Sequence, residues 1–335
     1  MRFIRKDVSD DECKQLLCNA AAENKLPFDI SQQSMVKRFC EGGQSLPLNV
    51  DNRYVVRFPR EGGEQTWLEM QRESLICSVL RLHSFNLPVS DVKTAEYKEI
   101  SFAYHQAING KTMDILPREN NIAYNSLSVE QKNLLATDLA LFLVKLHQIL
   151  PEETVHIPKA ETIDYLYDCN APENSMVLAK FGIDYDRFKT SVNDQDKVFC
   201  HNDLHGRNMA FDEEKEQVLM GIFDFGMAGF NQRSADFVKL CTIDRNLARL
   251  TVQKYNELSP QKVNMKEVDY QFLNWTAQNL RYADRQPKEN REKFVQLAKA
   301  HLTAFRLDTL KEKIERPHKR DIALPQQHNL RSQER

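Results

Sequence analysis

Residues 198–211 read VFCHNDLHGRNMAF, and residues 222–226 read IFDFG. The pattern between these segments predicts a β-hairpin, with strands at 209–211 and 218–223 around a polar turn. Paired strands lie about 4.8 Å apart, so such a hairpin returns Asp224 to the neighbourhood of Asn208. Since Asp203 precedes Asn208 by five residues on one loop, we expect all three side chains to lie close together.

These three side chains are of the types that phosphoryl transfer requires. A carboxylate can orient an acceptor hydroxyl and take its proton, which is the predicted catalytic role of Asp203. Asn208 and Asp224 offer oxygen ligands of the kind that Mg²⁺ prefers. Each short motif also arises by chance, as a polar loop or a turn, so the prediction depends on their order and spacing together.

Bulk composition excludes several classes of protein. The 335 residues carry a formal net charge of -2 and a hydrophobic fraction of 41%, which predicts no attraction to nucleic acid or anionic membrane. No apolar run approaches the roughly 20 residues that cross a bilayer, and the amino terminus does not resemble a secretory signal. Seven scattered cysteines without a C-x-x-C pair indicate reduced thiols. A cytoplasmic location and no obligate protein partner are therefore expected.

The front part of the chain, residues 1–108, is rich in strand patterns. Strands are predicted at 53–58, 89–95 and 100–107. Two pairs with capping-box spacing predict helix starts: Ser9 with Glu12, for a helix at 9–23, and Thr66 with Glu69, for a helix that ends near 82.

The back part, residues 109–310, is predicted to be mainly helical. Asn109-Gly110 is a turn or hinge signal between the two parts. Ser128 and Gln131 have the spacing to cap a long helix with a leucine-rich face. Residues 311–335 are charged and lack apolar periodicity, which predicts a flexible tail. Cys200 is interpreted as a small buried residue that ends a strand, with a reactive thiol as the alternative.

The segments HNDLHGRN at 201–208 and IFDFG at 222–226 resemble the motifs of the aminoglycoside phosphotransferase superfamily, a group of small-molecule kinases that includes choline kinase. The resemblance implies an α+β, two-lobed, protein-kinase-like fold, with a small antiparallel-sheet N-lobe and a larger, mainly helical C-lobe. It implies ATP or GTP as phosphoryl donor, Mg²⁺ as cofactor and a small hydroxylated substrate. By the same resemblance, Asp236 braces the catalytic loop, and His147 and His201 are structural.

The resemblance also implies a nucleotide site in the front part. Segment 41–45 corresponds to a phosphate-covering turn, with a plain turn between strands as the alternative. Arg57 stands where related kinases carry the phosphate-pairing lysine. Glu73 corresponds to the ion-pair partner of that base, with an exposed helical glutamate as the alternative. Segment 106–108 corresponds to the hinge whose backbone meets the adenine. The implied nucleotide-binding residues are Gly42, Gly43, Ser45, Arg57, Glu73, Gln106 and Ile108.

Two other functions remain open at this point. A catalytically silent binding or scaffold protein is one, because Arg57 replaces the expected lysine. A protein kinase is the other, although only about ten residues separate Gly226 from Asp236 and no A-P-E motif follows. The acceptor is undetermined, since the C-terminal helices carry both acidic residues that suit an aminoglycoside and aromatic residues that suit a choline-like head. For Trp275 and Tyr270, burial in a helical core is the expected role.

Overall fold

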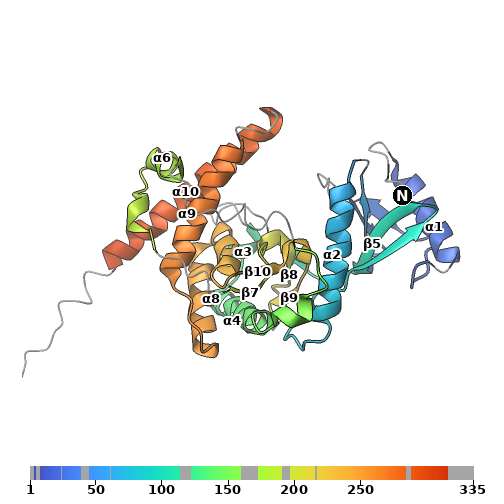
Figure 1. The fold of residues 1–335 in the computed structure, drawn as a ribbon, viewed down its shortest axis with the longest axis horizontal. Coiled ribbons are helices and arrows are strands. Elements are labelled where there is room, and N and C mark those ends of the chain that lie inside the picture. Colours follow the sequence, from blue (N-terminus) through green and yellow to red (C-terminus); the bar gives the residue numbers. More distant parts are fainter. Residues whose placement is uncertain are drawn as a thin grey trace, which may run out of the picture.

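An antiparallel sheet forms the core of the front lobe, which lies at the right of Figure 1. The structure, a computed structural model, describes residues 4, 8–23, 25–38, 45–60, 62–113, 122–159, 173–190, 197–215, 217–283 and 288–315. The five strands follow the order β1-β2-β3-β5-β4, and each pairs antiparallel with its neighbour. They are β1 (Val36–Arg38), β2 (Ser45–Val50), β3 (Tyr54–Pro59), β5 (Ile100–Gln106) and β4 (Lys93–Tyr97).

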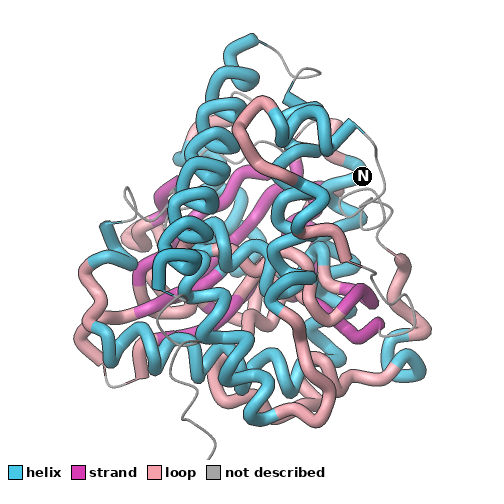
Figure 2. The backbone as a smooth tube through the Cα atoms, turned by 90° about the vertical axis from the view of Figure 1, so that its left-hand side faces the viewer, coloured by secondary structure: helices cyan, strands magenta, loops and turns pink. Residues whose placement is uncertain are grey.

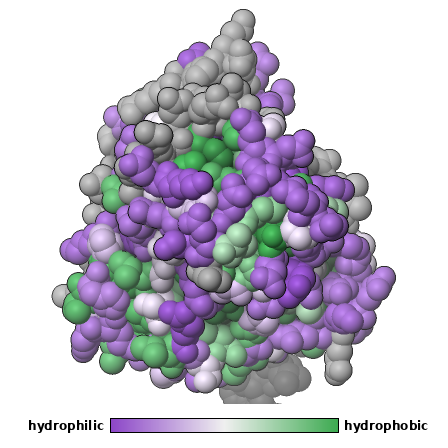
Figure 3. All heavy atoms as spheres, turned by 90° about the vertical axis from the view of Figure 1, so that its right-hand side faces the viewer, coloured by the Kyte–Doolittle hydropathy of each residue, from purple (hydrophilic) through white to green (hydrophobic). Residues whose placement is uncertain are grey.

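Two helices cover this sheet. Helix α1 (Asp10–Ala22) buries Leu17 in one cluster with Leu48 and Val56 of the strands. Helix α2 (Glu64–Leu80) packs through Trp67 and Met70 against Ala103 in a second cluster. Side chains alternate between the faces of a strand, so Arg57 points away from the first cluster and toward α2. The outer face of this lobe is hydrophilic over most of its described surface, with smaller apolar areas (Figure 3).

One of the two predicted helix starts in this lobe is correct. Ser9 and Glu12 form a reciprocal capping box at the start of α1. The predicted box of Thr66 and Glu69 is wrong, because α2 begins at Glu64 after Gly63 and has no side-chain cap. A Cβ atom on Gly63 would lie 2.5 Å from the carbonyl oxygen of Arg60. The chain therefore turns into the helix where glycine allows close backbone contact, ahead of the capping pattern.

The second lobe is mainly helical. Ser128 and Gln131 cap α4 as predicted, and the leucine-rich face of α4 lies in the large core. Figure 2 views the molecule from this lobe and shows helices in front with strands behind them. The helices are α3 (Ile122–Asn125), α4 (Val129–Leu146), α6 (Glu173–Ala179), α7 (Ala235–Val238), α8 (Arg245–Leu258), α9 (Met265–Ala283) and α10 (Lys288–Glu315).

Two small sheets in this lobe carry the catalytic segments. Strand β7 (Lys197–Cys200) pairs with β10 (Gly229–Gln232), and β6 (Lys111–Thr112), β8 (Met209–Phe211) and β9 (Leu219–Ile222) form the other sheet. The predicted hairpin is confirmed as β8 and β9. Gly110, in the predicted hinge, has φ 124°, and a Cβ atom there would lie 2.8 Å from the carbonyl oxygen of Phe211. Glycine therefore permits the contact between hinge and hairpin.

The prediction of a flexible tail at residues 311–335 is wrong for its first residues. Helix α10 continues to Glu315, so the first part of segment 311–335 is helical. The remainder of that segment lies outside the described residues. Among the described helices, none combines the length and the apolar character needed to span a membrane.

Candidate active site

The loop after β7 holds Asp203 between two polar partners. The Asn208 amide donates to the backbone oxygen of Asp203 at 2.9 Å and to its Oδ2 at 3.2 Å. The ammonium of Lys239 donates to the other carboxylate oxygen, Oδ1. Burial opposes ionisation of Asp203, but Lys239 and His205 outweigh it and hold the pKa of the carboxyl below its ordinary value. The carboxylate is therefore ionised at neutral pH.

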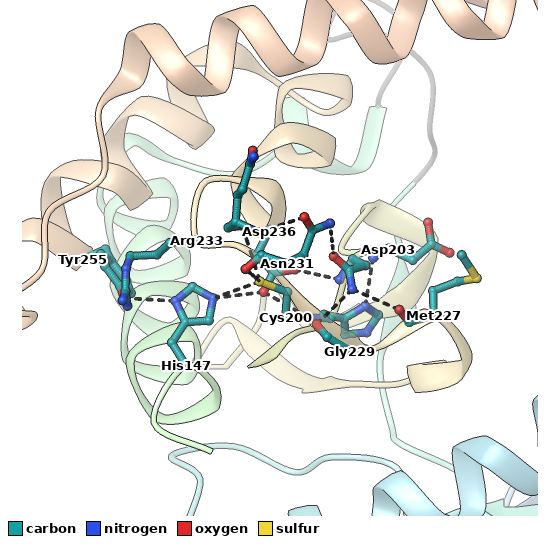
Figure 4. Close-up of polar contacts among 12 residues, drawn as sticks. His147, Cys200, Asp203, Met227, Gly229, Asn231, Arg233, Asp236 and Tyr255 are labelled. Atoms are coloured by element: carbon teal, nitrogen blue, oxygen red, sulfur yellow. Dashed lines mark hydrogen bonds and ion pairs between the residues drawn. The ribbon is translucent and has the colours of Figure 1, made fainter. Parts of the chain in front are cut away.

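Asp236 braces this loop, the role that the resemblance implied for it. Its two carboxylate oxygens accept the backbone N–H groups of His201, at 3.0 Å, and Asn202, at 2.8 Å (Figure 4). Asn202 has φ 63° and is held there by its own amide, which donates to the carbonyl oxygens of Met227 and Gly229. The loop is thus fixed through hydrogen bonds to the segment that follows Asp224.

Behind Asp236, a buried polar chain continues into the helices. Nε2 of His147 lies 3.1 Å from Asp236 Oδ2, and Nδ1 lies 3.0 Å from the hydroxyl of Tyr255. Arg233 donates to the same hydroxyl at 2.8 Å. Figure 4 shows these side chains in line behind the loop. The buried position of His147 at the end of α4 agrees with a structural role.

Among the residues that the structure describes, one group of His, Cys and Asp side chains has the composition of a metal site. Ligand atoms of His147, Cys200 and Asp236 all lie within 4.8 Å of one another. Both Asp236 oxygens already accept backbone N–H groups, and the Cys200 thiol lies 3.5 Å from the carbonyl oxygen of Gln232. Burial raises the pKa of this thiol well above its ordinary value. The cluster is therefore a satisfied hydrogen-bonded core, and Cys200 is a buried residue at the end of a strand, as predicted.

The hairpin brings the predicted metal ligands together. The backbone N–H of Phe223, next to Asp224, donates to the carbonyl oxygen of Asn208 at 3.1 Å. Within the described chain, Oδ1 of Asn208 accepts no hydrogen bond, since its amide nitrogen makes the contacts to Asp203. Asp224 has a left-handed backbone, φ 66°, and a side chain that is 47% exposed. Both side chains thus keep oxygen atoms available, an arrangement that fits Mg²⁺.

Arg57 and Glu73 join the front lobe to this centre. The guanidinium of Arg57 forms an ion pair with Glu73, which is 1% exposed, and lies 3.8 Å from an oxygen of Asp224. Burial opposes the charge on Arg57, but the carboxylates of Glu73 and Asp224 outweigh it and raise the pKa of Arg57. The other Glu73 oxygen accepts the N–H of Phe225 at 3.0 Å. Glu73 is therefore a buried residue that connects Arg57 to the backbone of Phe225, and the alternative of an exposed helical glutamate is wrong.

Of the predicted residues in segment 41–45, the structure describes only Ser45. Ser45 begins β2 opposite Pro59, and its hydroxyl has no hydrogen-bond partner among the described residues. Gly42 and Gly43 lie outside the described residues.

The predicted hinge follows β5. Gln106 ends that strand, and Ala107 donates to the carbonyl oxygen of Arg53 at 2.7 Å. The N–H of Ile108 donates to no group in the described chain. A Cβ atom on Gly221 would lie 2.8 Å from Cγ2 of Ile108, so glycine in β9 allows the hinge to pack on the hairpin.

Two residues of this centre were not found from the sequence. Lys239 reaches Asp203 from η6 (Lys239–Thr242), three positions beyond Asp236. Arg72, on α2, donates to the carbonyl oxygens of Pro158 and Gly226, both at 2.6 Å, and to that of Ala228. The i, i+3 spacing of Lys239 from Asp236 was an available signal. For Arg72, the only available sequence signal was its position next to Glu73.

A protein family shares the sequence pattern of this centre. Its model, described as "Phosphotransferase enzyme family", matches residues 48–260. No significant match to a curated protein sequence was found.

Several solved structures share the fold. The GDP complex of aminoglycoside 2'-phosphotransferase-IIIa has a TM-score of 0.68 at 17% identity, covering 88% of this chain and 99% of that one. The ternary complex of streptomycin, ATP and APH(2")-IIa has a TM-score of 0.56 at 16% identity, covering 84% and 97%. Macrolide 2'-phosphotransferase type I has a TM-score of 0.56 at 17% identity, covering 90% and 99%.

These likenesses confirm the predicted α+β, two-lobed, kinase-like fold. The family model covers more than half of the chain, including the loop with Asp203 and Asn208 and the hairpin that ends at Asp224. The chain belongs to the phosphotransferase enzyme family.

Proposed function

We propose that this protein transfers the terminal phosphoryl group of ATP or GTP, with Mg²⁺, to a hydroxyl group of a small molecule. The observation that carries the proposal is the convergence of three side chains. Asp203, Asn208 and Asp224 come from two segments that the β8–β9 hairpin joins, and the N–H of Phe223 bonds to Asn208 at 3.1 Å. This is the set of groups that phosphoryl transfer needs.

In this proposal Asp203 orients the acceptor hydroxyl and accepts its proton. The carboxylate is held in place by Asn208 and Lys239, and its lowered pKa keeps it ionised. A base of low pKa takes the proton late, as bond formation to phosphorus makes the hydroxyl acidic. Lys239 has the further effect of placing a positive charge where the phosphoryl group would arrive.

Asn208 and Asp224 would hold the divalent ion through Oδ1 and the carboxylate. When bound, Mg²⁺ neutralises charge on the nucleotide phosphates. Arg57 adds a fixed positive charge 3.8 Å from Asp224, and arginine can contact phosphate oxygens in a bidentate manner. Glu73 holds the guanidinium in position.

The nucleotide base would lie at the hinge. The N–H of Ile108, without a partner in the described chain, is available to a purine nitrogen. Ser45, with Gly42 and Gly43, would contact the phosphates from the front lobe. Solved relatives were captured with GDP and with ATP, which is compatible with either donor here.

The test is a coupled assay for release of nucleoside diphosphate. Purified protein receives ATP or GTP with Mg²⁺ and a panel of aminoglycosides, amino alcohols, sugars and nucleosides. We expect acceptor-dependent release by the natural chain and a loss of about 10²–10⁴-fold in Asp203→Asn, with nucleotide affinity retained. Equal loss of turnover and of nucleotide binding in Asp203→Asn would assign Asp203 a folding role and overturn its place in the proposal.

A further inference from the structure

A pocket of about 300 Å³ opens beside Asp203, between the catalytic loop and helices α9 and α10. Lys239 lines the pocket next to Asp203, with its Nζ 5.9 Å from the centroid of the Trp275 ring. Trp275 of α9 and Phe294 and His301 of α10 form the helical side of the pocket. Because the Asp203 carboxylate faces this space, a hydroxyl bound in the pocket meets the proposed base. The class of acceptor inferred from this pocket therefore rests on the proposed function.

The charges around the pocket do not suit a polycation. Asp203 is the one acidic residue among the described lining residues, and Lys239 already pairs with it. Arg207 and Lys239 bring two positive charges. Burial lowers the pKa of His301 to about 4, so this ring is neutral at pH 7. An ammonium group in this space would meet Lys239, and Asp203, the one carboxylate among the described lining residues, is already paired with that lysine.

The side of the pocket that α9 and α10 form is apolar and aromatic, with a few uncharged polar groups. Trp275 is half-buried, and Phe294 is 39% exposed at the rim. His301 is 3% exposed, and its Nε2 has no hydrogen-bond partner in the described chain. The amide of Asn279 also lacks a partner among the described residues and lines the same space. Apolar and aromatic walls with a small number of polar groups are typical of small-molecule sites, and the polar groups on this side of the pocket carry no charge.

We propose that the acceptor is a compact, uncharged alcohol with a flat apolar ring that packs on Trp275 and Phe294, with its hydroxyl at Asp203. Its polar ring atoms bond to Asn279 and His301. Trp275 and Phe294 are then specificity-determining residues, and aminoglycosides are excluded as substrates by charge.

Tryptophan fluorescence provides a direct binding test, because the chain has two tryptophans. Trp67 lies in the front lobe on α2, and Trp275 lies in the pocket. In a Trp67→Phe variant with saturating ADP and Mg²⁺, a panel of neutral aryl alcohols and nucleosides should give a saturable change in Trp275 emission. Trp275→Phe, in which Trp67 is the only reporter, should give none. Kanamycin should neither change the emission nor compete.

Turnover gives a second, independent measurement. Phe294→Ala removes the rim ring and should raise KM about tenfold for the neutral ring alcohol that is turned over, with kcat little changed. Leu307→Ala is the matched control, since Leu307 lies on the same helix at 44% exposure and does not line this pocket. Its KM should be unchanged.

The outcomes separate this inference from the proposed function. Competition by kanamycin, or no binding and no turnover of any neutral ring alcohol while Mg²⁺-nucleotide still binds, would overturn the inference alone. Absence of Mg²⁺-nucleotide binding would overturn the proposed function itself.

Discussion

At the residue scale, Asp203 depends on Lys239 for its charge state. Burial favours the neutral carboxyl, and the adjacent ammonium is the largest of the influences that oppose burial. The two residues are 36 positions apart in sequence. Their contact arises from the path of the chain through β9, β10 and α7, so no local sequence pattern could predict it. By contrast, the proximity of Asn208 and Asp224 was predictable, because a single hairpin joins them.

Lys239→Met should shift the acid limb of the kcat/KM profile toward higher pH. The Asp203 pKa is lowered in the native protein, and removal of the cation leaves burial unopposed, so the pKa rises and ionisation requires a higher pH. The measurement is the pH dependence of nucleoside diphosphate release. Lys239→Arg is the control and should retain the native profile. An unshifted acid limb in Lys239→Met, with the same unfolding midpoint as the native chain, would contradict this role.

Arg57 is the second residue whose charge has a predicted effect that can be measured. Arg57→Met should weaken nucleotide binding at least about tenfold, because a phosphate-facing charge is lost and a buried hydrogen-bonded charge contributes about 2–5 kcal/mol. Calorimetric titration with ATP and Mg²⁺ measures the change. Arg57→Lys should recover a large part of the affinity, since the charge is kept while the bidentate geometry is lost. Equal affinity in the native and Arg57→Met proteins would remove Arg57 from the nucleotide site.

At the element scale, α2 is fastened to the segment around Asp224 by two adjacent side chains. Glu73 accepts the N–H of Phe225, and Arg72 donates to the carbonyl oxygens of Gly226 and Ala228. A third donor group of Arg72 reaches Pro158. The position of the helix and the position of the segment that follows Asp224 are therefore coupled.

Arg72→Met should destabilise the protein by about 2–4 kcal/mol, because three carbonyl oxygens lose a charged donor at a buried site. Burial lowers the pKa of Arg72 to about 10, so the native side chain is still a cation at neutral pH. Chemical denaturation measures the loss. Arg81→Met is the matched control just after the same helix. Its ion pair with Asp91 is exposed, and its removal should cost less than about 1 kcal/mol. Equal effects of the two variants would show that Arg72 does not anchor the segment.

Element boundaries show where sequence patterns succeed and fail. Capping at Ser9 and Ser128 was predictable because both partners of each box are close in sequence. The start of α2 was not predictable, because it depends on the close approach of Gly63 to the carbonyl oxygen of Arg60. The pattern at Thr66 and Glu69 was overridden by backbone contact. Arg72 could not be found either, since its acceptors lie 86 to 156 positions away.

At the scale of the whole molecule, the residues proposed as the active centre come from both lobes. Arg57 comes from the sheet of the front lobe, and Asp224 comes from the helical lobe. The two-lobed, α+β fold was predictable from strand patterns that give way to helical periodicity and from the resemblance of the catalytic motifs. The pocket beside Asp203 was not predictable, because it forms between the loop that holds Asp203 and two helices, α9 and α10, that carry no recognisable motif. Tyr270 is buried as predicted, whereas Trp275 lines that pocket.

The most direct test of the phosphoryl-transfer centre is Mg²⁺-dependent stabilisation by nucleotide, measured as the unfolding midpoint with ATP or GTP. At 100 times Kd, a bound nucleotide stabilises the native state by about 2.7 kcal/mol. The native chain and Asp203→Asn should both show a midpoint increase that requires Mg²⁺. Asp224→Asn should lose the Mg²⁺-dependent part, because it removes a carboxylate ligand. No increase in the native chain, or the same Mg²⁺-dependent increase in Asp224→Asn, would contradict the assignment of Asp203, Asn208 and Asp224 as that centre.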